Sequence, residues 1–117
     1  MSAEERELVQ AALSGIGAPA SLPRAFSLAQ NSPNPFNPST TISYTVPEGK
    51  PVPVSLRIFD LRGNLIQTLV NATRAAGTYQ VSWDGTDESG RQVAGGIYFY
   101  RLRAEEFTQT RKMVLLK

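Results

Sequence analysis

Apolar and polar residues alternate in short runs along this chain, beyond its first 25 residues. In residues 41–46, for example, Ile42, Tyr44 and Val46 fall on one face, and hydroxyl residues fall on the other. Successive side chains of a β-strand point to opposite faces, so each run predicts a strand with one buried face.

Turn-forming residues separate these runs at the intervals expected of a β-sandwich. We predict seven strands, at residues 26–30, 41–46, 54–58, 65–70, 79–83, 98–103 and 110–116. The expected fold is an all-β antiparallel sandwich, Ig-like or fibronectin-III-like, with Trp83 as its core anchor. It has no disulfide, because the chain has no cysteine.

The connections carry their own signals. Residues 31–40, NSPNPFNPST, alternate Asn and Pro, and both residue types restrict the backbone to turns and extended segments. We interpret this stretch, the Asn-Pro corner, as an ordered structure with Phe36 as its apolar plug; the alternative is a plain loop. Residues 60–64 predict a hairpin turn with Gly63 at positive φ. Residues 71–77 are expected to form a polar link.

The first 25 residues differ from the rest. Residues 3–13 predict a short helix, with Ser2 as its N-cap and Glu5 completing a capping box. Gly and Pro in residues 14–24 predict a linker. We therefore expect two parts: residues 1–25, a helix and linker that are an upstream remnant or a docking segment, and the sandwich, residues 26–117. The acidic N-terminus lacks the features of a signal peptide, which suggests the tail of a longer protein.

Composition limits the chemistry. The chain has no histidine and no cysteine, so the commonest general base and the thiolate nucleophile are absent, and we expect no enzyme. A net charge of +2 argues against nucleic-acid binding. No apolar run is long enough for a transmembrane segment. Asp84, Asp87 and Glu88 are weak calcium candidates, and the alternative is that they cap a turn. No other cofactor is expected.

The strand at residues 98–103 carries aromatic and basic residues. Phe99 faces away from the core side of this strand and could stack on a sugar, although such residues more often belong to the sheet surface. Arg101 and Arg103 share its face, and Arg57 joins them if its strand is adjacent. Either they form a solvated ladder, paired with the acidic residues 105–106, or they form a basic patch for a partner.

The last strand, RKMVLLK, is apolar on both faces: Met113 and Leu115 share one, and Val114 and Leu116 share the other. Such a strand is buried on both faces or awaits a partner on one. At a sheet edge it can be recognised by strand addition. The alternative is an ordinary last strand.

Four blocks carry a family resemblance: NSPNPFNPSTTISYTVP, VSLRIFDLRGNLIQTL, AGTYQVSWDGTDESGRQVAGGIYFYRL and TRKMVLLK. Together they resemble the type A C-terminal sorting domain of type IX secretion cargo. They are similar also to the Ig-like domain of flagellar hook-capping proteins. The resemblance covers residues 26–117.

The resemblance implies a non-enzymatic secretion, sorting and surface-anchoring domain of a longer exported protein. Its expected partners are the outer-membrane secretion machinery and a sortase-like peptidase, and its expected location is extracellular or on the outer cell surface, reached through the periplasm. The implied sorting signal comprises Lys112, Met113, Val114, Leu115, Leu116 and Lys117. The implied fold-defining turn comprises Trp83, Asp84, Gly85, Gly90, Gly96 and Tyr98. The Asn-Pro corner matches at Asn34, Pro35, Phe36, Asn37 and Pro38.

Two other functions stay open. One is a self-assembling structural module, such as a filament subunit, that uses segment 1–25 and open sheet edges. The other is a carbohydrate-binding module that uses Phe99 and Tyr79.

Overall fold

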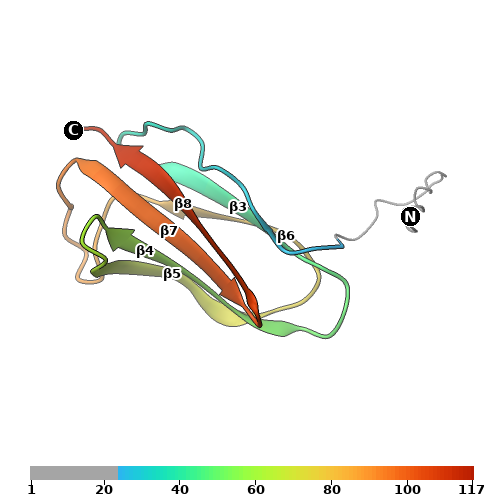
Figure 1. The fold of residues 1–117 in the computed structure, drawn as a ribbon. Helices are drawn as coiled ribbons and strands as arrows, with labels where there is room; N and C mark the ends of the chain where they lie inside the picture. Colours follow the sequence, from blue (N-terminus) through green and yellow to red (C-terminus); the bar gives the residue numbers. More distant parts are fainter. Residues whose placement is uncertain (1–23) are drawn as a thin grey trace.

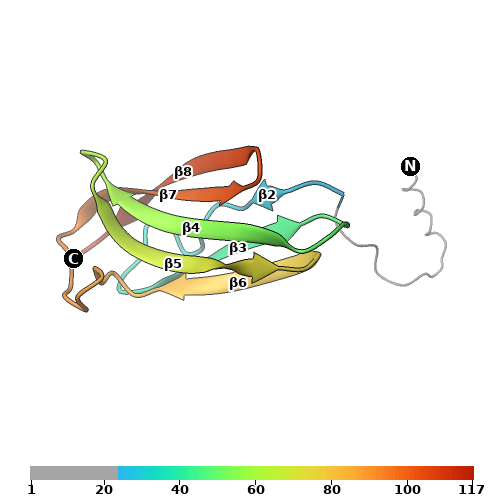
Figure 2. The ribbon, with the colours of Figure 1, turned by 90° about the horizontal axis from the view of Figure 1, so that it is seen from below.

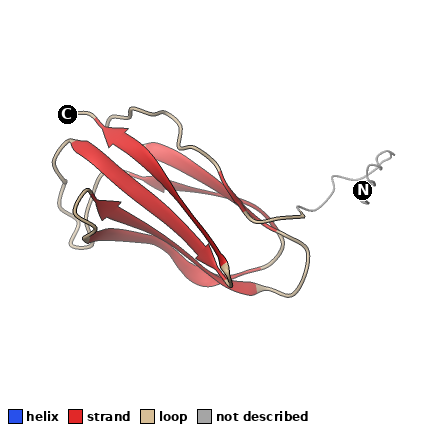
Figure 3. Cartoon of the chain, in the orientation of Figure 1, coloured by secondary structure: helices blue, strands red, loops and turns tan. Residues whose placement is uncertain are grey.

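The computed structural model of this chain describes residues 24–117, and all the regular elements among them are β-strands (Figure 1, Figure 3). The strands are β2 Ser27–Leu28, β3 Thr40–Val46, β4 Val52–Asp60, β5 Leu65–Arg74, β6 Gly77–Trp83, β7 Gly96–Ala104 and β8 Phe107–Leu115.

These seven strands form two antiparallel sheets that lie face to face (Figure 2). One sheet has the order β2-β3-β6, and the other has the order β5-β4-β7-β8. Neighbours such as β4 and β7 are far apart in sequence, so the chain crosses between the layers repeatedly. The predicted all-β Ig-like sandwich is confirmed.

The core lies between the sheets and is filled by the inward members of each alternating run. Ile42 on β3, Leu56 and Ile58 on β4, and Tyr100 on β7 are all 0% exposed. Their neighbours in sequence are intermediate or exposed, which is the alternation that burial of one face imposes. The predicted inward faces of these strands are therefore confirmed.

Several predicted strand boundaries are wrong. The last strand begins at Phe107 rather than at residue 110, because its first residues pair with the end of β7, and it ends at Leu115 rather than at residue 116. β5 runs on through residues 71–74 instead of ending in a polar link, because Val52 pairs with Arg74 and Val54 with Ala72. The outward face of this sheet tolerates polar residues, so polarity alone did not mark a loop. The first strand is confined to Ser27–Leu28 instead of running to residue 30. Beyond it the backbone bonds to β3 only at Ala29 and Ser32, while the Gln30 side chain turns to β8.

The predicted helix at residues 3–13 and all but the last residue of the linker at 14–24 lie outside the described residues. The division into residues 1–25 and 26–117 therefore stays a prediction. Within residues 24–117 there is no helical segment capable of crossing a bilayer.

Candidate functional site: the last strand and the Asn-Pro corner

β8 is the edge strand of the four-stranded sheet, and its two faces have different environments. Met113 and Leu115 point into the core and are 0% and 3% exposed. On the other face Lys112 is exposed and Val114 is half-buried, and beyond the strand Leu116 is 50% exposed. The strand is therefore buried on one face only, and its other face is accessible to a partner.

The Asn-Pro corner lies against the end of β8 (Figure 1). The Phe36 N–H donates to the Val114 carbonyl at 3.0 Å, and the Leu116 N–H donates to the Phe36 carbonyl at 2.9 Å. Phe36 and Leu115 thereby form a parallel bridge. The Val114 N–H also donates to Asn34 Oδ1 at 3.0 Å. The corner is thus an ordered structure with a defined partner, as predicted.

The segment that leads into the corner continues this contact along the strand. Gln30 Nε2 donates to the Lys112 carbonyl at 2.8 Å, and Arg111 Nε donates to the Leu28 carbonyl at 2.6 Å. The Lys112 carbonyl, the Val114 N–H and carbonyl, and the Leu116 N–H therefore already have partners. Because strand addition needs free backbone groups, the end of β8 is closed to it in this state.

Three aromatic rings support the corner from the core. The Phe36 side chain is 1% exposed, and its centroid lies 5.7 Å from that of Trp83. Trp83 in turn meets Tyr98 edge-on at 5.4 Å. The indole N–H donates to the Thr86 carbonyl at 2.8 Å, and the Tyr98 hydroxyl donates to the Ala94 carbonyl at 2.6 Å. Burial raises the pKa of Tyr98 above its usual value. Phe36 and Trp83 are the plug and the anchor expected from the sequence.

The acidic turn after β6 is organised by Asp87. Its Oδ1 accepts from the Ser89 hydroxyl at 2.7 Å, the Ser89 N–H at 2.9 Å and the Arg91 N–H at 3.0 Å. The hydrogen bond from the Ser89 side chain, followed by those from the backbone, lowers the pKa of Asp87. This carboxylate therefore holds a turn together.

The other two calcium candidates, Asp84 and Glu88, make different hydrogen bonds. Asp84 Oδ1 accepts from the Thr86 hydroxyl at 2.6 Å. Glu88 is exposed, and its N–H donates to the Ile66 carbonyl at 2.9 Å, which ties the turn to β5. In the described part of the chain, no three carboxylates come together in a group that could hold a metal ion. The geometry favours the turn-capping interpretation.

Two glycines of this region lie beside residues 115–117, Gly85 with a positive φ that favours glycine and Gly95 in a close contact. Gly85 has φ +79°, and a Cβ on it would lie 3.5 Å from both the Leu115 side chain and the Pro38 carbonyl. At Gly95 a Cβ would lie 2.8 Å from Lys117 Cγ, so a side chain there would push the last residue away. Gly95 was not singled out from the sequence, although it belongs to the Gly-Gly pair before β7. The remaining glycines of the predicted turn, Gly90 and Gly96, also have positive φ.

A buried polar cluster that joins the two ends of the corner, Asn31 and Thr40, was not predicted from the sequence. Asn31 is 3% exposed; its N–H donates to the Tyr100 hydroxyl at 2.8 Å, and that hydroxyl donates to the Ala29 carbonyl at 2.7 Å. Asn31 Nδ2 donates to Thr40 Oγ1 at 3.0 Å. The available signal was Tyr100 itself, since a tyrosine in the middle of a buried strand needs a partner for its hydroxyl.

The aromatic and basic candidates of β7 are brought to one face of their sheet. Arg57 lies opposite Arg101, so its strand is adjacent to β7 and Arg57 joins Arg101 and Arg103 on this face. Phe99 is half-buried rather than exposed. Tyr79 is on the other sheet, stacked on Tyr44 at 5.2 Å, and is not available as a sugar platform beside Phe99.

The family model described as the FlgD Ig-like domain matches residues 36–107. A comparison with curated proteins finds no match.

Two solved structures share the fold. Dimeric latent PorU from Porphyromonas gingivalis matches 80% of this chain with a TM-score of 0.65 and 21% identity. PorZ, described as an essential bacterial surface component of the type-IX secretion system of the same organism, matches 79% with a TM-score of 0.50 and 19% identity. The matched regions are 9% of the PorU chain and 11% of the PorZ chain, so this sandwich is a small part of each.

Proposed function

This chain belongs to the FlgD Ig-like domain family, and on that premise we propose that it is a non-enzymatic sorting domain of a longer exported protein. It addresses that protein to the type IX secretion machinery and to the outer cell surface. Support comes from the same fold in PorU and PorZ, where it is likewise a small part of a longer chain. PorZ is itself described as a surface component of that secretion system.

The observation that carries the proposal is how the end of β8 is held. Met113 and Leu115 anchor it in the core, and its outer backbone edge is covered by the Asn-Pro corner. What remains accessible is a set of outward side chains: Lys112, Leu116 and Lys117. A receptor would therefore bind two cationic side chains and one apolar side chain, instead of pairing a strand of its own with β8. A sortase-like peptidase is the second proposed partner.

The experiment separates recognition from folding. A secreted reporter is fused ahead of this chain and expressed in a bacterium with an active type IX system. The test variant combines Lys112→Glu, Leu116→Ser and Lys117→Glu, which changes only exposed side chains and leaves Met113 and Leu115 in place. We expect the reporter to stay in the periplasm.

A matched control carries the same kinds of change elsewhere: Lys50→Glu, Leu61→Ser and Arg62→Glu, all at exposed positions. We expect it to be exported like the parent chain. Both variants should show unchanged thermal unfolding as purified 117-residue chains. Normal export of the test variant would refute the role of these side chains.

A self-assembling module is the second candidate, and one observation favours it. β6 is an edge strand of the three-stranded sheet, and β3 is its only strand partner among the described residues. An unpaired edge is a template for another chain. Size-exclusion chromatography of the chain tests this candidate: concentration-dependent oligomers support it, and a monomer at high micromolar concentration would exclude it.

A further inference from the structure

The outer face of the four-stranded sheet carries three arginines at its centre. Arg57 on β4 lies directly opposite Arg101 on β7, and Arg103 lies opposite Ser55 one row along. All three belong to the outward set, because their strand neighbours fill the core. We call this arrangement, Arg57, Arg101 and Arg103, the arginine face.

The arginine face is not neutralised within the described chain. Like charges directly opposite one another in a sheet repel, and no ion pair in residues 24–117 joins these guanidinium groups to a carboxylate. Arg57 Nε is buried and has no hydrogen-bond partner there. A buried donor without an acceptor is costly, so the hydrogen-bonding capacity of the Arg57 guanidinium is not satisfied within the described residues.

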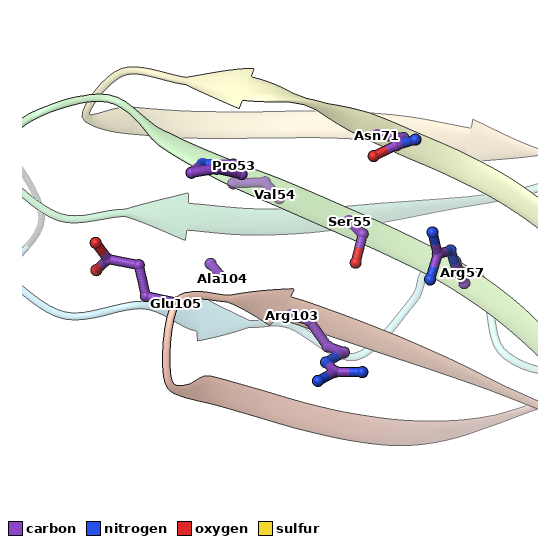
Figure 4. A pocket seen from close by; sticks show the side chains of 8 residues that line it. All are labelled: Pro53, Val54, Ser55, Arg57, Asn71, Arg103, Ala104 and Glu105. Atoms are coloured by element: carbon purple, nitrogen blue, oxygen red, sulfur yellow. The ribbon is translucent and has the colours of Figure 1, made fainter.

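The nearby carboxylates of Glu105 and Asp60 do not pair with the arginine face. Glu105 is exposed, and Figure 4 shows its carboxylate pointing away from the Arg103 guanidinium. Asp60 Oδ1 accepts from the N–H groups of Arg62 and Asn64, both at 2.9 Å, inside its own hairpin. The hydrogen bond from the Asn64 backbone lowers the pKa of Asp60, which keeps it ionised and committed to that turn.

Two hollows on this face present complementary chemistry. The polar residues that line one hollow combine guanidinium groups with a hydroxyl, an amide and one carboxylate: Ser55, Arg57, Asn71, Arg103 and Glu105 (Figure 4). The Glu105 carboxylate is directed away from the guanidinium groups. Hydroxyls and amides both donate and accept hydrogen bonds, as a ligand rich in hydroxyl groups requires.

The other hollow lies toward the β4–β5 hairpin and is lined by Phe59, Phe99, Arg101 and Thr110. Arg101 lies over the Phe59 ring, with its Cζ 4.4 Å from the centroid, and Phe99 pairs with Phe59 across the strands. An apolar surface formed by Phe59 and Phe99 therefore lies beside the arginine face on the same sheet.

We propose that this surface binds an acidic saccharide: its carboxylate, sulfate or phosphate group sits at Arg57 and Arg103, and a sugar ring lies on Phe99. The chemistry distinguishes this ligand from a peptide. β4 and β7 are the two central strands of their sheet, so their backbone groups are used in pairing and offer no edge for strand addition. Recognition is left to side chains. The proposal is independent of the sorting role of the last strand.

The test is isothermal titration of the 117-residue chain with three probes at low salt. The probes are trigalacturonate, which carries three carboxylates, the neutral sugar maltotriose, and hexaglutamate as an acidic peptide. We expect trigalacturonate to bind, and binding to weaken as salt screens the charges. Arg57→Gln and Arg103→Gln should each weaken it by about tenfold or more, because each removes a charged hydrogen-bond donor.

Lys50→Gln is the matched control, since it removes one exposed cation from the loop before β4 and should leave the affinity unchanged. Arg103 is exposed, so Arg103→Gln remains informative even if Arg57→Gln fails to fold. Absence of trigalacturonate binding, or equal binding of maltotriose, would overturn the proposal. Equal or tighter binding of hexaglutamate would assign the face to an acidic peptide instead.

Discussion

Replacing Phe36 with alanine tests whether the Asn-Pro corner is part of the folded core or only a connection. The residue lies in a loop between strands, where most substitutions change stability by less than about 0.5 kcal/mol. Its ring, however, is 1% exposed and packs on Trp83 with 5.7 Å between centroids. The structure therefore predicts the response of a core residue.

The size of the effect follows from this burial. Removing a fully buried phenylalanine side chain costs about 3–5 kcal/mol, which combines the lost transfer free energy with the cavity that remains. A domain of this size is stable by about 5–15 kcal/mol, so Phe36→Ala should remove a large fraction of the total. Because alanine keeps the backbone N–H and carbonyl, both hydrogen bonds to β8 can persist, and the loss reports the ring.

The measurement is urea unfolding of the 117-residue chain, followed by circular dichroism. A loss of this size lowers the midpoint by about 2 M for a typical urea dependence. Phe99→Ala is the matched control: its ring is half-buried on the outward face, so its removal leaves no enclosed cavity and should cost at most about 1.5 kcal/mol. A Phe36→Ala loss below that of Phe99→Ala would refute the reasoning.

Two further perturbations test other parts of the sandwich. Tyr100→Phe should lower the free energy of unfolding by about 1–3 kcal/mol, measured in urea, because the Ala29 carbonyl and the Asn31 N–H lose their buried partner; an unchanged midpoint would contradict this. The lowered pKa values of Asp60 and Asp87 mean that the unfolded state binds protons first as the pH falls. Their stabilisation should therefore be complete above the unfolded pKa of about 3.9 and lost as the pH falls through the lower folded values. Urea midpoints from pH 7 to pH 2 should show this loss, and the doubly Asn-substituted chain should show a flatter acid limb.

The strands of this fold are predictable because burial of one face leaves a local trace. Leu56 and Ile58 are two residues apart and point the same way, so their contacts with the core are visible within a few positions of sequence. Where the alternation of apolar and polar residues is absent, the strand boundary is not predictable. Residues 71–74 are mostly polar, yet they extend β5 because they pair with β4.

The contacts that shape the candidate site leave no such trace. Asn34 and Val114 are 80 positions apart, and no periodicity indicates that the side chain of one meets the backbone of the other. The same holds for Arg57 and Arg101, which became neighbours only because β4 pairs with β7. The resemblance to the Ig-like domain of hook-capping proteins is confirmed by the match over residues 36–107. That resemblance pointed to the corner and the turn, but it did not indicate that the corner contacts the last strand.

The parallel run of the corner beside β8 has a mechanical consequence. Leu28, Gln30, Asn34 and Phe36 succeed one another in the same direction as the β8 groups they bond. Tension between the two ends of the domain would therefore act in shear geometry, parallel to these two segments. Their hydrogen bonds would be loaded at the same time, instead of breaking one after another. Force spectroscopy should find a lower rupture force when Gln30 and Asn34 are both replaced by alanine. A domain pulled by its ends would in this way resist until the whole joint yields.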